Sequence, residues 1–172
     1  VLYGLTEADS NGNFLWTRKL IQFMKYYGIN GLGINSEFFS DTETMTHLMN
    51  FFADCHKKAK EEGWEFQIHW YDLMTSSGEK SFRNSLNSQN SSILGPDNNK
   101  KVDMFFLNYK WGGASLTSSV NMAKRLPRNS YDIFAGFDIQ KDGLNHYGWK
   151  SLANQPISIG FWGAHAQSLL HQ

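Results

Sequence analysis

The stretch Gly31–Glu37, with the sequence GLGINSE, has the residue types and spacing for chemistry. Successive side chains of a β-strand point to opposite faces, so Asn35 and Glu37 are predicted to lie side by side on one face. The apolar Leu32 and Ile34 would occupy the other face. A single carboxylic acid beside an amide suits acid/base chemistry on a substrate that brings its own nucleophile. The pattern also fits a strand end with two solvated polar residues, because short motifs recur by chance.

The elements that must position these residues alternate along the chain. Strands are predicted at Val1–Thr6, Gly31–Glu37, Glu65–Asp72, Asp103–Tyr109, Tyr131–Ile139 and Pro156–Trp162. Helices are predicted at Phe14–Tyr27, from a cap at Asp41 or Thr42 to about Glu62, and at Glu79–Leu86, Ser115–Leu126, Tyr147–Ala153 and Ala164–His171. Alternation of strands and helices is typical of parallel β/α units.

Four of the strands share a further pattern, in which one face is bulky and apolar and the other is small or polar and ends in a functional group. A β/α barrel needs this arrangement, since apolar residues face outward beneath helices and site residues stand at the carboxyl rim. We therefore predict a single α/β domain over residues 1–172, a parallel TIM-type barrel that is incomplete, with about six units and without its first and last strands. An open doubly wound sheet also fits, but GLGIN opens no helix and is not a dinucleotide-binding loop.

Composition and charge exclude several classes of function. The 172 residues carry 16 basic and 16 acidic side chains, so nothing indicates a nucleic-acid or membrane-surface partner. No apolar run approaches a membrane span, so we predict none. A metal role for His69 with Gln67 is the lesser alternative, and no other histidine has ligand spacing with a carboxylate, so we predict no metal site. Cys55 is the only cysteine and lies on an apolar helical stripe, which predicts a buried thiol. Aromatic residues reach 15%, and sugar-binding clefts also use aromatic faces.

Five segments in order resemble glycoside hydrolase family 85, the endo-β-N-acetylglucosaminidases. They are YYGINGLGINSE, HWYDLMTSSGEKSFRNSLNSQNSSIL, DMFFLNYKW, YDIFAGFDIQKDG and PISIGFWG, each at a junction of a predicted strand and its loop. The resemblance implies an enzyme without cofactors that cuts between the two core GlcNAc residues of N-linked glycans. It also implies a retaining, substrate-assisted mechanism, an exception to the scheme with two carboxylates.

The resemblance also implies roles for particular residues. Glu37 would be the general acid/base, and Asn35 would hold the 2-acetamido group whose carbonyl oxygen attacks the anomeric carbon. Tyr71 falls where the family has a tyrosine that assists the acetamido group. Trp111 falls where an aromatic residue lines the sugar site, and Phe82 stands where many members have Trp. The further predicted substrate-binding residues are Asn108, Asp138 and Trp162, although Asp138 could instead hydrogen-bond inside the barrel.

Other interpretations stay open at this stage. A glycan-binding barrel without turnover would need neither Asn35 nor Glu37 in this pairing. A chitinase-like hydrolase is disfavoured because the D-x-x-D-x-E strand is missing, with Asn35 in place of the last Asp. His69 and Gln67 are predicted as satisfied polar residues of the barrel interior. The single cysteine and the Asn/Ser/Lys-rich loops favour a secreted or cell-surface bacterial-type enzyme, with a cytoplasmic enzyme as the alternative. The preferred glycan type and the oligomeric state stay open.

Overall fold

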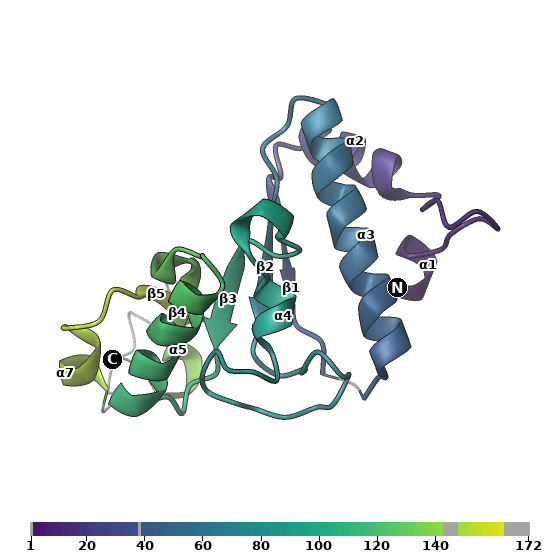
Figure 1. Ribbon diagram of the computed structural model, residues 1–172. Coiled ribbons are helices and arrows are strands. Elements are labelled where there is room, and N and C mark those ends of the chain that lie inside the picture. Colours follow the sequence, from purple (N-terminus) through teal and green to yellow (C-terminus); the bar gives the residue numbers. More distant parts are fainter. Residues whose placement is uncertain (1, 38, 143–147, 164–172) are drawn as a thin grey trace.

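Five parallel strands form one sheet in chain order in the computed structural model, which describes residues 2–37, 39–142 and 148–163 (Figure 1). The strands are β1 (Gly31–Ile34), β2 (Gln67–Tyr71), β3 (Met104–Leu107), β4 (Ile133–Asp138) and β5 (Ser158–Trp162). Each neighbouring pair is parallel. The α/β class with parallel units is therefore confirmed, and the sheet is an open part of a β/α barrel.

Three longer helices alternate with the strands, α2 (Thr17–Tyr26), α3 (Thr42–Glu61) and α5 (Gly113–Arg125). Short helices are α1 (Leu2–Leu5), α4 (Ser91–Leu94), α6 (Ile139–Asp142) and α7 (Trp149–Leu152), with 3₁₀ turns at Asp97–Asn99 and Ser130–Asp132. In Figure 1, α2 and α3 stand beside β1 and β2, and α5 stands beside β3 and β4. No helix in the described part of the chain is long and apolar enough to cross a membrane.

The two faces of the sheet differ as the alternating pattern predicts. On β2, Ile68 and Trp70 are fully buried toward the helices, whereas Gln67 and His69 on the opposite face are exposed. The same helix-side core contains Phe105 and Leu107 of β3. Helices therefore cover one face of the sheet, and the other face corresponds to the interior of a barrel.

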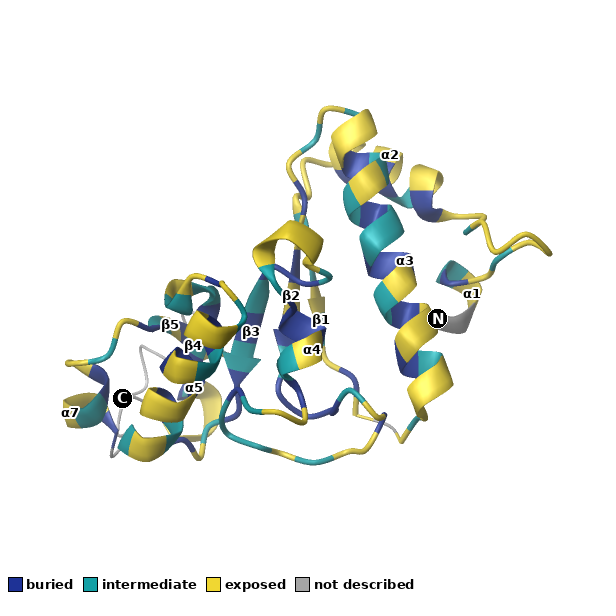
Figure 2. Ribbon diagram, viewed as in Figure 1, coloured by how far each residue is buried: buried dark blue, intermediate teal, exposed yellow. Residues whose placement is uncertain are grey.

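The long helix α3 shows how local sequence sets an element. The Asp41 side chain accepts a hydrogen bond from the backbone N–H of Thr44 at 2.7 Å, which caps the first turn. Buried residues recur at helical spacing along α3, giving it the buried and exposed bands in Figure 2. Cys55 lies in this buried stripe and is fully shielded, as predicted. The helix ends before Gly63, whose φ of +60° favours glycine.

The predicted strand at Val1–Thr6 is wrong, because residues 2–5 form the helical turn α1. A short apolar run fits a strand or a buried helical turn equally well by periodicity. A strand also needs a neighbour for its hydrogen-bond ladder. Here His47 of α3 instead hydrogen-bonds with the carbonyl oxygen of Thr6 at 2.7 Å, which ties the segment to a helix.

The predicted helix at Glu79–Leu86 is also wrong, because this segment has no helical turn. The backbone N–H of Ser81 donates to the carbonyl of Leu73 at 2.7 Å, and Met74 forms an isolated bridge with Lys80. These contacts with residues six to eight positions earlier use backbone groups that a helix would pair internally. The predicted helix at Ala164–His171 lies outside the described residues.

Candidate active site

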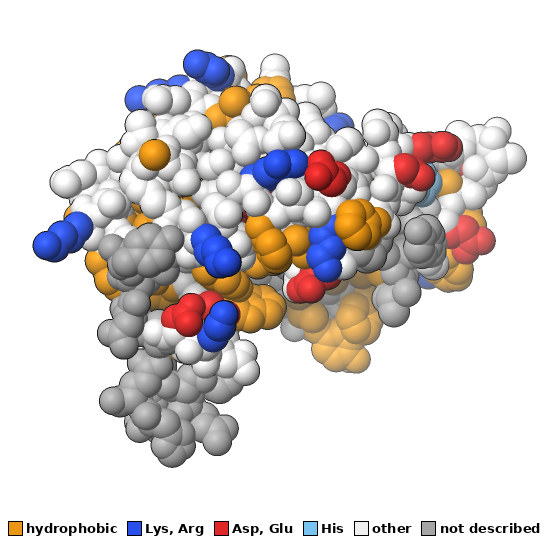
Figure 3. Space-filling model, turned by 90° about the horizontal axis from the view of Figure 1, so that it is seen from below, with side chains coloured by type: hydrophobic (Ala, Val, Ile, Leu, Met, Phe, Trp, Pro, Cys, Tyr) orange, Lys and Arg blue, Asp and Glu red, His pale blue; other side chains and the backbone are white. Residues whose placement is uncertain are grey.

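A cavity of about 390 Å³ opens at the carboxyl ends of the strands. Its polar lining residues are Asn35, Glu37, His69 and Asp138, and aromatic rings reach it from Tyr71, Phe106, Tyr109 and Trp162. Figure 3 views the molecule from below, onto this edge, where hydrophobic side chains lie among acidic and basic ones. Because parallel strands end at one edge, residues more than 120 positions apart in the chain meet here.

Asn35 and Glu37 project to the same side immediately after β1 ends at Ile34. The Asn35 Nδ2 donates a hydrogen bond to Glu37 Oε1 at 2.9 Å, and both residues are exposed to the cavity. Ser36 between them is 4% exposed and points away, with its hydroxyl 4.0 Å from the sulfur of Met74. The alternation of the strand thus continues for three residues beyond it and presents an amide beside a carboxylate.

Tyr71 is the last residue of β2 and brings a phenol to the same cavity. Its hydroxyl donates to Asn108 Oδ1 at 2.8 Å. Burial raises the pKa of Tyr71 to about 12, opposed by a hydrogen bond with Tyr109 and reinforced by the nearby Glu37 carboxylate. The side chain is therefore a neutral hydrogen-bonding group at ordinary pH.

Aromatic rings form the wall next to Tyr71. The rings of Phe106 and Tyr109 each lie 6.0 Å from that of Tyr71, centroid to centroid. Phe106 fits because Gly136 and Gly160 on the next two strands have no side chain, and a Cβ at either position would collide with its ring. The small residues on the inner face of the sheet therefore make room for a cavity wall.

Asp138 and Trp162 close the other side of the cavity. They end β4 and β5 and are paired in the register of these strands. Asp138 Oδ1 accepts a hydrogen bond from the backbone N–H of Lys141 at 3.1 Å, and Trp162 is 50% exposed. That hydrogen bond is an exposed contact with the backbone of α6 rather than one inside the barrel, and the side chain lines the cavity. Contact of Asp138 with sugar stays a prediction.

His69 lies on the inner face of β2, where its Nε2 is 3.4 Å from Gln67 Oε1. Its ring stacks near Phe134 at a centroid distance of 6.3 Å. Desolvation lowers the pKa of His69 below its ordinary value, which favours the neutral ring at pH 7. Within the described residues, no group of three or more His, Cys, Asp or Glu side chains could hold a metal ion.

Trp111 does not line the cavity, contrary to the prediction from the resemblance. It is fully buried, and its indole N–H donates to the carbonyl of Gly136 at 2.8 Å. Its ring meets Phe137 edge-on at 5.3 Å. The chain turns back toward the helices after Tyr109, so Trp111 packs in the core, where its N–H needs this partner.

Two other predicted substrate-binding residues lie beside the cavity rather than along it. Asn108 is 6% exposed, and its amide is occupied by Tyr71 and Asn84. Phe82 is half exposed and meets the Tyr71 ring edge-on at 6.3 Å. A contact between Phe82 and sugar stays a prediction, whereas Asn108 supports Tyr71.

Sequence reasoning missed Tyr109 and Phe106. Tyr109 lies two residues beyond the end of β3, the zone where Asn35 and Glu37 follow β1. An aromatic residue within three positions of a strand's carboxyl end was the available signal. Phe106 lies in the apolar run MFFL, whose pattern does not separate core from cavity residues. Only its position against the small residues Gly136 and Gly160 of the next two strands identifies it as a cavity residue.

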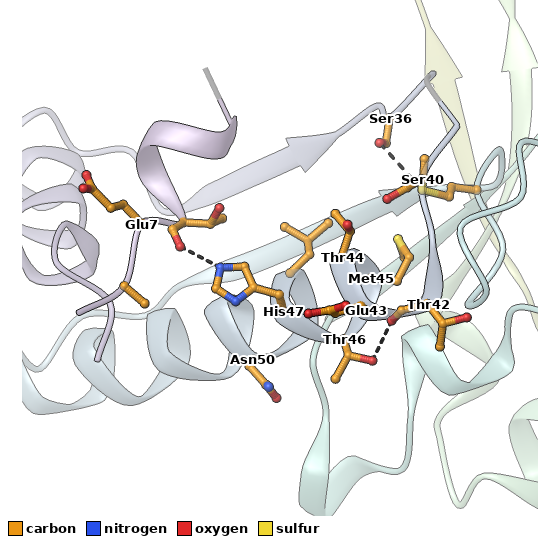
Figure 4. Close-up of a pocket in the computed structure, with 14 residues that line it drawn as sticks. Glu7, Ser36, Ser40, Thr42, Glu43, Thr44, Met45, Thr46, His47 and Asn50 are labelled. Carbon is orange, nitrogen blue, oxygen red and sulfur yellow. Dashed lines mark hydrogen bonds between the residues drawn. The ribbon is translucent and has the colours of Figure 1, made fainter. Parts of the chain in front are cut away.

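A larger hollow of about 950 Å³ lies elsewhere, between the amino-terminal segment and the first turns of α3 (Figure 4). Its lining is rich in hydroxyl groups and includes Glu7, Glu43 and His47, but neither Asn35 nor Glu37. Ser36 faces this hollow, on the opposite side from its two neighbours. The residues with paired acid and amide chemistry belong to the smaller cavity.

Comparisons with known proteins agree with this geometry. The chain is similar to the glycoside hydrolase domain of Endo-D from Streptococcus pneumoniae, with a TM-score of 0.88 and 25% sequence identity. That similarity covers 99% of this chain and 28% of the other, so the chain spans little more than a quarter of its length. No curated protein matches the chain. Residues 2–168 match the sequence profile of glycosyl hydrolase family 85, and the chain therefore belongs to this family of glycoside hydrolases.

Proposed function

We propose that the chain carries the acid/base part of an endo-β-N-acetylglucosaminidase that cleaves between the two core GlcNAc residues of N-linked glycans. The observation that carries the proposal is the contact between Asn35 and Glu37, 2.9 Å apart in a cavity at the carboxyl ends of parallel strands. Membership of the family supports glycoside hydrolysis, and the named relative is an Endo-D domain. The site, more than the fold, supports the choice of reaction.

In the first step, Glu37 donates its proton to the glycosidic oxygen of the departing GlcNAc. The carbonyl oxygen of the substrate's own 2-acetamido group attacks the anomeric carbon as that bond breaks, which gives an oxazoline-type intermediate. Asn35 holds the acetamido group in place, since its amide stays neutral through both steps. In the second step, the Glu37 carboxylate takes a proton from water, whose oxygen opens the oxazoline with retained configuration.

Aromatic rings around the pair support a sugar substrate. Tyr71, Tyr109, Phe106 and Trp162 surround the space next to Glu37. Apolar faces of sugar rings pack on such side chains while the hydroxyl groups keep polar partners. The neutral hydroxyl of Tyr71 is suited to orient the acetamido group without adding charge.

A specific observation favours a second candidate, a glycosidase that uses two carboxylates. Asp138 lines the same cavity as Glu37 and could act as a nucleophile or base in such a scheme. Its carboxylate is engaged by the backbone N–H of Lys141. Asp138→Asn separates the schemes: substrate assistance predicts a modest loss of hydrolysis, and a two-carboxylate scheme predicts loss as deep as for Glu37→Gln.

The decisive experiment uses Asn35→Ala in the full-length protein. If Asn35 holds the acetamido group, the variant should barely hydrolyse a glycopeptide but should still transfer a pre-made glycan oxazoline to a GlcNAc acceptor, because Glu37 can still activate the acceptor hydroxyl. Asn98→Ala, an exposed asparagine in the 3₁₀ turn after α4, is the matched control and should keep both activities. Transfer lost together with hydrolysis in a folded variant would contradict the role of Asn35.

The substrate is tested in parallel. A high-mannose glycopeptide should be cleaved between its core GlcNAc residues, and a free chitooligosaccharide should not. Cleavage of the chitooligosaccharide alone would point to a chitinase-like enzyme. Binding of glycan without any turnover by the full-length protein would point to a glycan-binding barrel.

A further inference from the structure

The hydroxyl of Tyr71 is connected to a chain of side-chain amides outside the cavity. Tyr71 donates to Asn108 Oδ1 at 2.8 Å, and Asn108 Nδ2 donates to Asn84 Oδ1 at 2.7 Å. Asn84 Oδ1 also accepts a hydrogen bond from the backbone N–H of Lys110 at 3.2 Å. Asn84 comes from the irregular segment after β2 and Asn108 from the end of β3, so the chain of bonds joins two loops.

The backbone group at the end of this chain fixes the direction of every bond. A backbone N–H can only donate, so the atom of Asn84 that faces Lys110 is its oxygen. That oxygen then requires the NH2 group of Asn108, which turns the Asn108 oxygen toward Tyr71. Tyr71 must therefore be the donor. Orientations of amides are assigned from such networks, and here a main-chain donor leaves one solution.

The position of Asn84 is itself constrained. Its φ is +53°, a conformation that asparagine adopts more readily than most residues. The buried carboxyl group of Asp72, next to Tyr71 in the chain, accepts a hydrogen bond from the side-chain NH2 of Asn90 at 3.1 Å. Burial raises its pKa, and the nearby backbone of Asn84 and Asn108 opposes that rise. The oxygen of the Asn84 side chain therefore lies where it meets both the backbone N–H of Lys110 and the NH2 group of Asn108.

We propose that Asn84 and Asn108 are positioning residues that fix the hydroxyl of Tyr71 at the cavity before substrate arrives. This inference rests on the proposed function for its kinetic effect, because Tyr71 assists the acetamido group there. Neither asparagine touches the reacting atoms. Their contribution is geometric, and a displacement of about 1 Å at a catalytic group can cost about 10²-fold in rate.

The test is a double-mutant cycle in the full-length protein. Asn84→Gly removes the acceptor while keeping the positive φ unstrained, and it should lower kcat about 10-fold or more with little change in KM. In a Tyr71→Phe background, which has no hydroxyl to position, the same change should have almost no further effect. Equal losses from Asn84→Gly in both backgrounds would overturn the proposal, since a general structural role gives additive effects.

A conservative variant adds a second criterion. Asn84→Asp keeps an oxygen acceptor for Lys110 and for Asn108, so it should restore most of the kcat that Asn84→Gly loses. Failure of Asn84→Asp to restore kcat, with an unchanged melting temperature, would also overturn the proposal.

A readout without substrate separates this inference from the proposed function. The side-chain NH2 of Asn108 should exchange slowly with solvent in the wild type and in Asn84→Asp, and faster in Asn84→Gly, as NMR can measure. If the wild type hydrolyses no N-glycan yet shows this exchange pattern, the proposed function fails and the positioning network stands. Fast exchange in the wild type would reject the network itself.

Discussion

The two ends of the sheet use charged and polar residues in opposite ways. At the amino end, Arg128 is almost fully buried and donates to the carbonyls of Leu94, Val102 and Asp103 at 3.1, 3.2 and 2.7 Å. Its Nε also donates to Asp132 at 3.0 Å. At the carboxyl end, Glu37 is exposed beside a cavity and receives a hydrogen bond from the neighbouring Asn35.

The carboxylates of Asp103, at the amino end of the sheet, and Glu37, at the carboxyl end, differ in the same way. Asp103 precedes β3, accepts the backbone N–H of Ile68 at 2.7 Å, and pairs with Lys100 at 2.7 Å. Such a carboxylate has its hydrogen-bonding capacity taken up by the fold and holds two strands in register. Glu37 lines the cavity, and within the described residues its carboxylate accepts a side-chain hydrogen bond only from Asn35. The degree to which a polar group is satisfied by the fold, more than its type, separates structural from catalytic candidates here.

Glu37→Gln should have the largest effect on activity and little on stability. Losing a general acid/base typically costs about 10²–10⁴-fold in rate. A substrate with a good leaving group should lose less in its first step, because its departure needs less protonation. Hydrolysis of both substrates measures this, with the exposed Glu65→Gln as the control. Equal losses on the two substrates would count against Glu37 as the acid.

Arg128→Met should lower the stability of the protein through the amino end of the sheet, whereas Glu37→Gln should lower its activity. Removing one member of a buried charge network leaves carbonyls and Asp132 without a donor, which costs about 3–5 kcal/mol in unfolding free energy. Arg18→Met is the matched control, since Arg18 is exposed and pairs with Glu61 and Glu62, and surface pairs contribute about 0–1 kcal/mol. Denaturant unfolding of both variants tests the contrast, and equal losses would refute it.

Gly160→Ala should have a smaller effect, which lowers stability and also raises KM. The added methyl group would collide with the ring of Phe106, and overpacking typically costs about 1–3 kcal/mol. Because Phe106 lines the cavity, KM should rise as its ring moves. Gly33→Ala is the control for stability, since a Cβ there meets open space. An unchanged melting temperature for Gly160→Ala would show that the ring has room to move.

The effect of Asp72→Asn on stability should depend on pH. Burial raises the pKa of Asp72 from 3.8 to about 7 in the folded protein, so the folded state binds the proton more tightly than the unfolded chain does. Its contribution to stability is therefore complete below about pH 4 and is lost as pH rises through about 7. The difference in unfolding free energy between wild type and variant should change between pH 4 and pH 8. A constant difference would contradict the raised pKa.

Much of the fold could be predicted because its signals are local. Alternation of apolar and polar residues predicts strands where the structure has β1 to β5, and helical spacing predicts helices where it has α2, α3 and α5. The placement of Asn35 and Glu37 on one side followed from the same two-residue period, and the resemblance to family 85 is confirmed. The roles assigned to Glu37, Asn35 and Tyr71 stay predictions.

The sequence by itself determined the strands, the main helices and the pairing of an amide with an acid after β1. Only the tertiary structure decided that Tyr109 lines the cavity while Trp111 lies in the core, and that Asn108 holds Tyr71. The physical reason is the range of the interactions. A strand's faces follow from its own dihedral angles, whereas the path of a loop depends on partners far along the chain, such as Gly136 for the indole of Trp111 and Asn84 for the amide of Asn108.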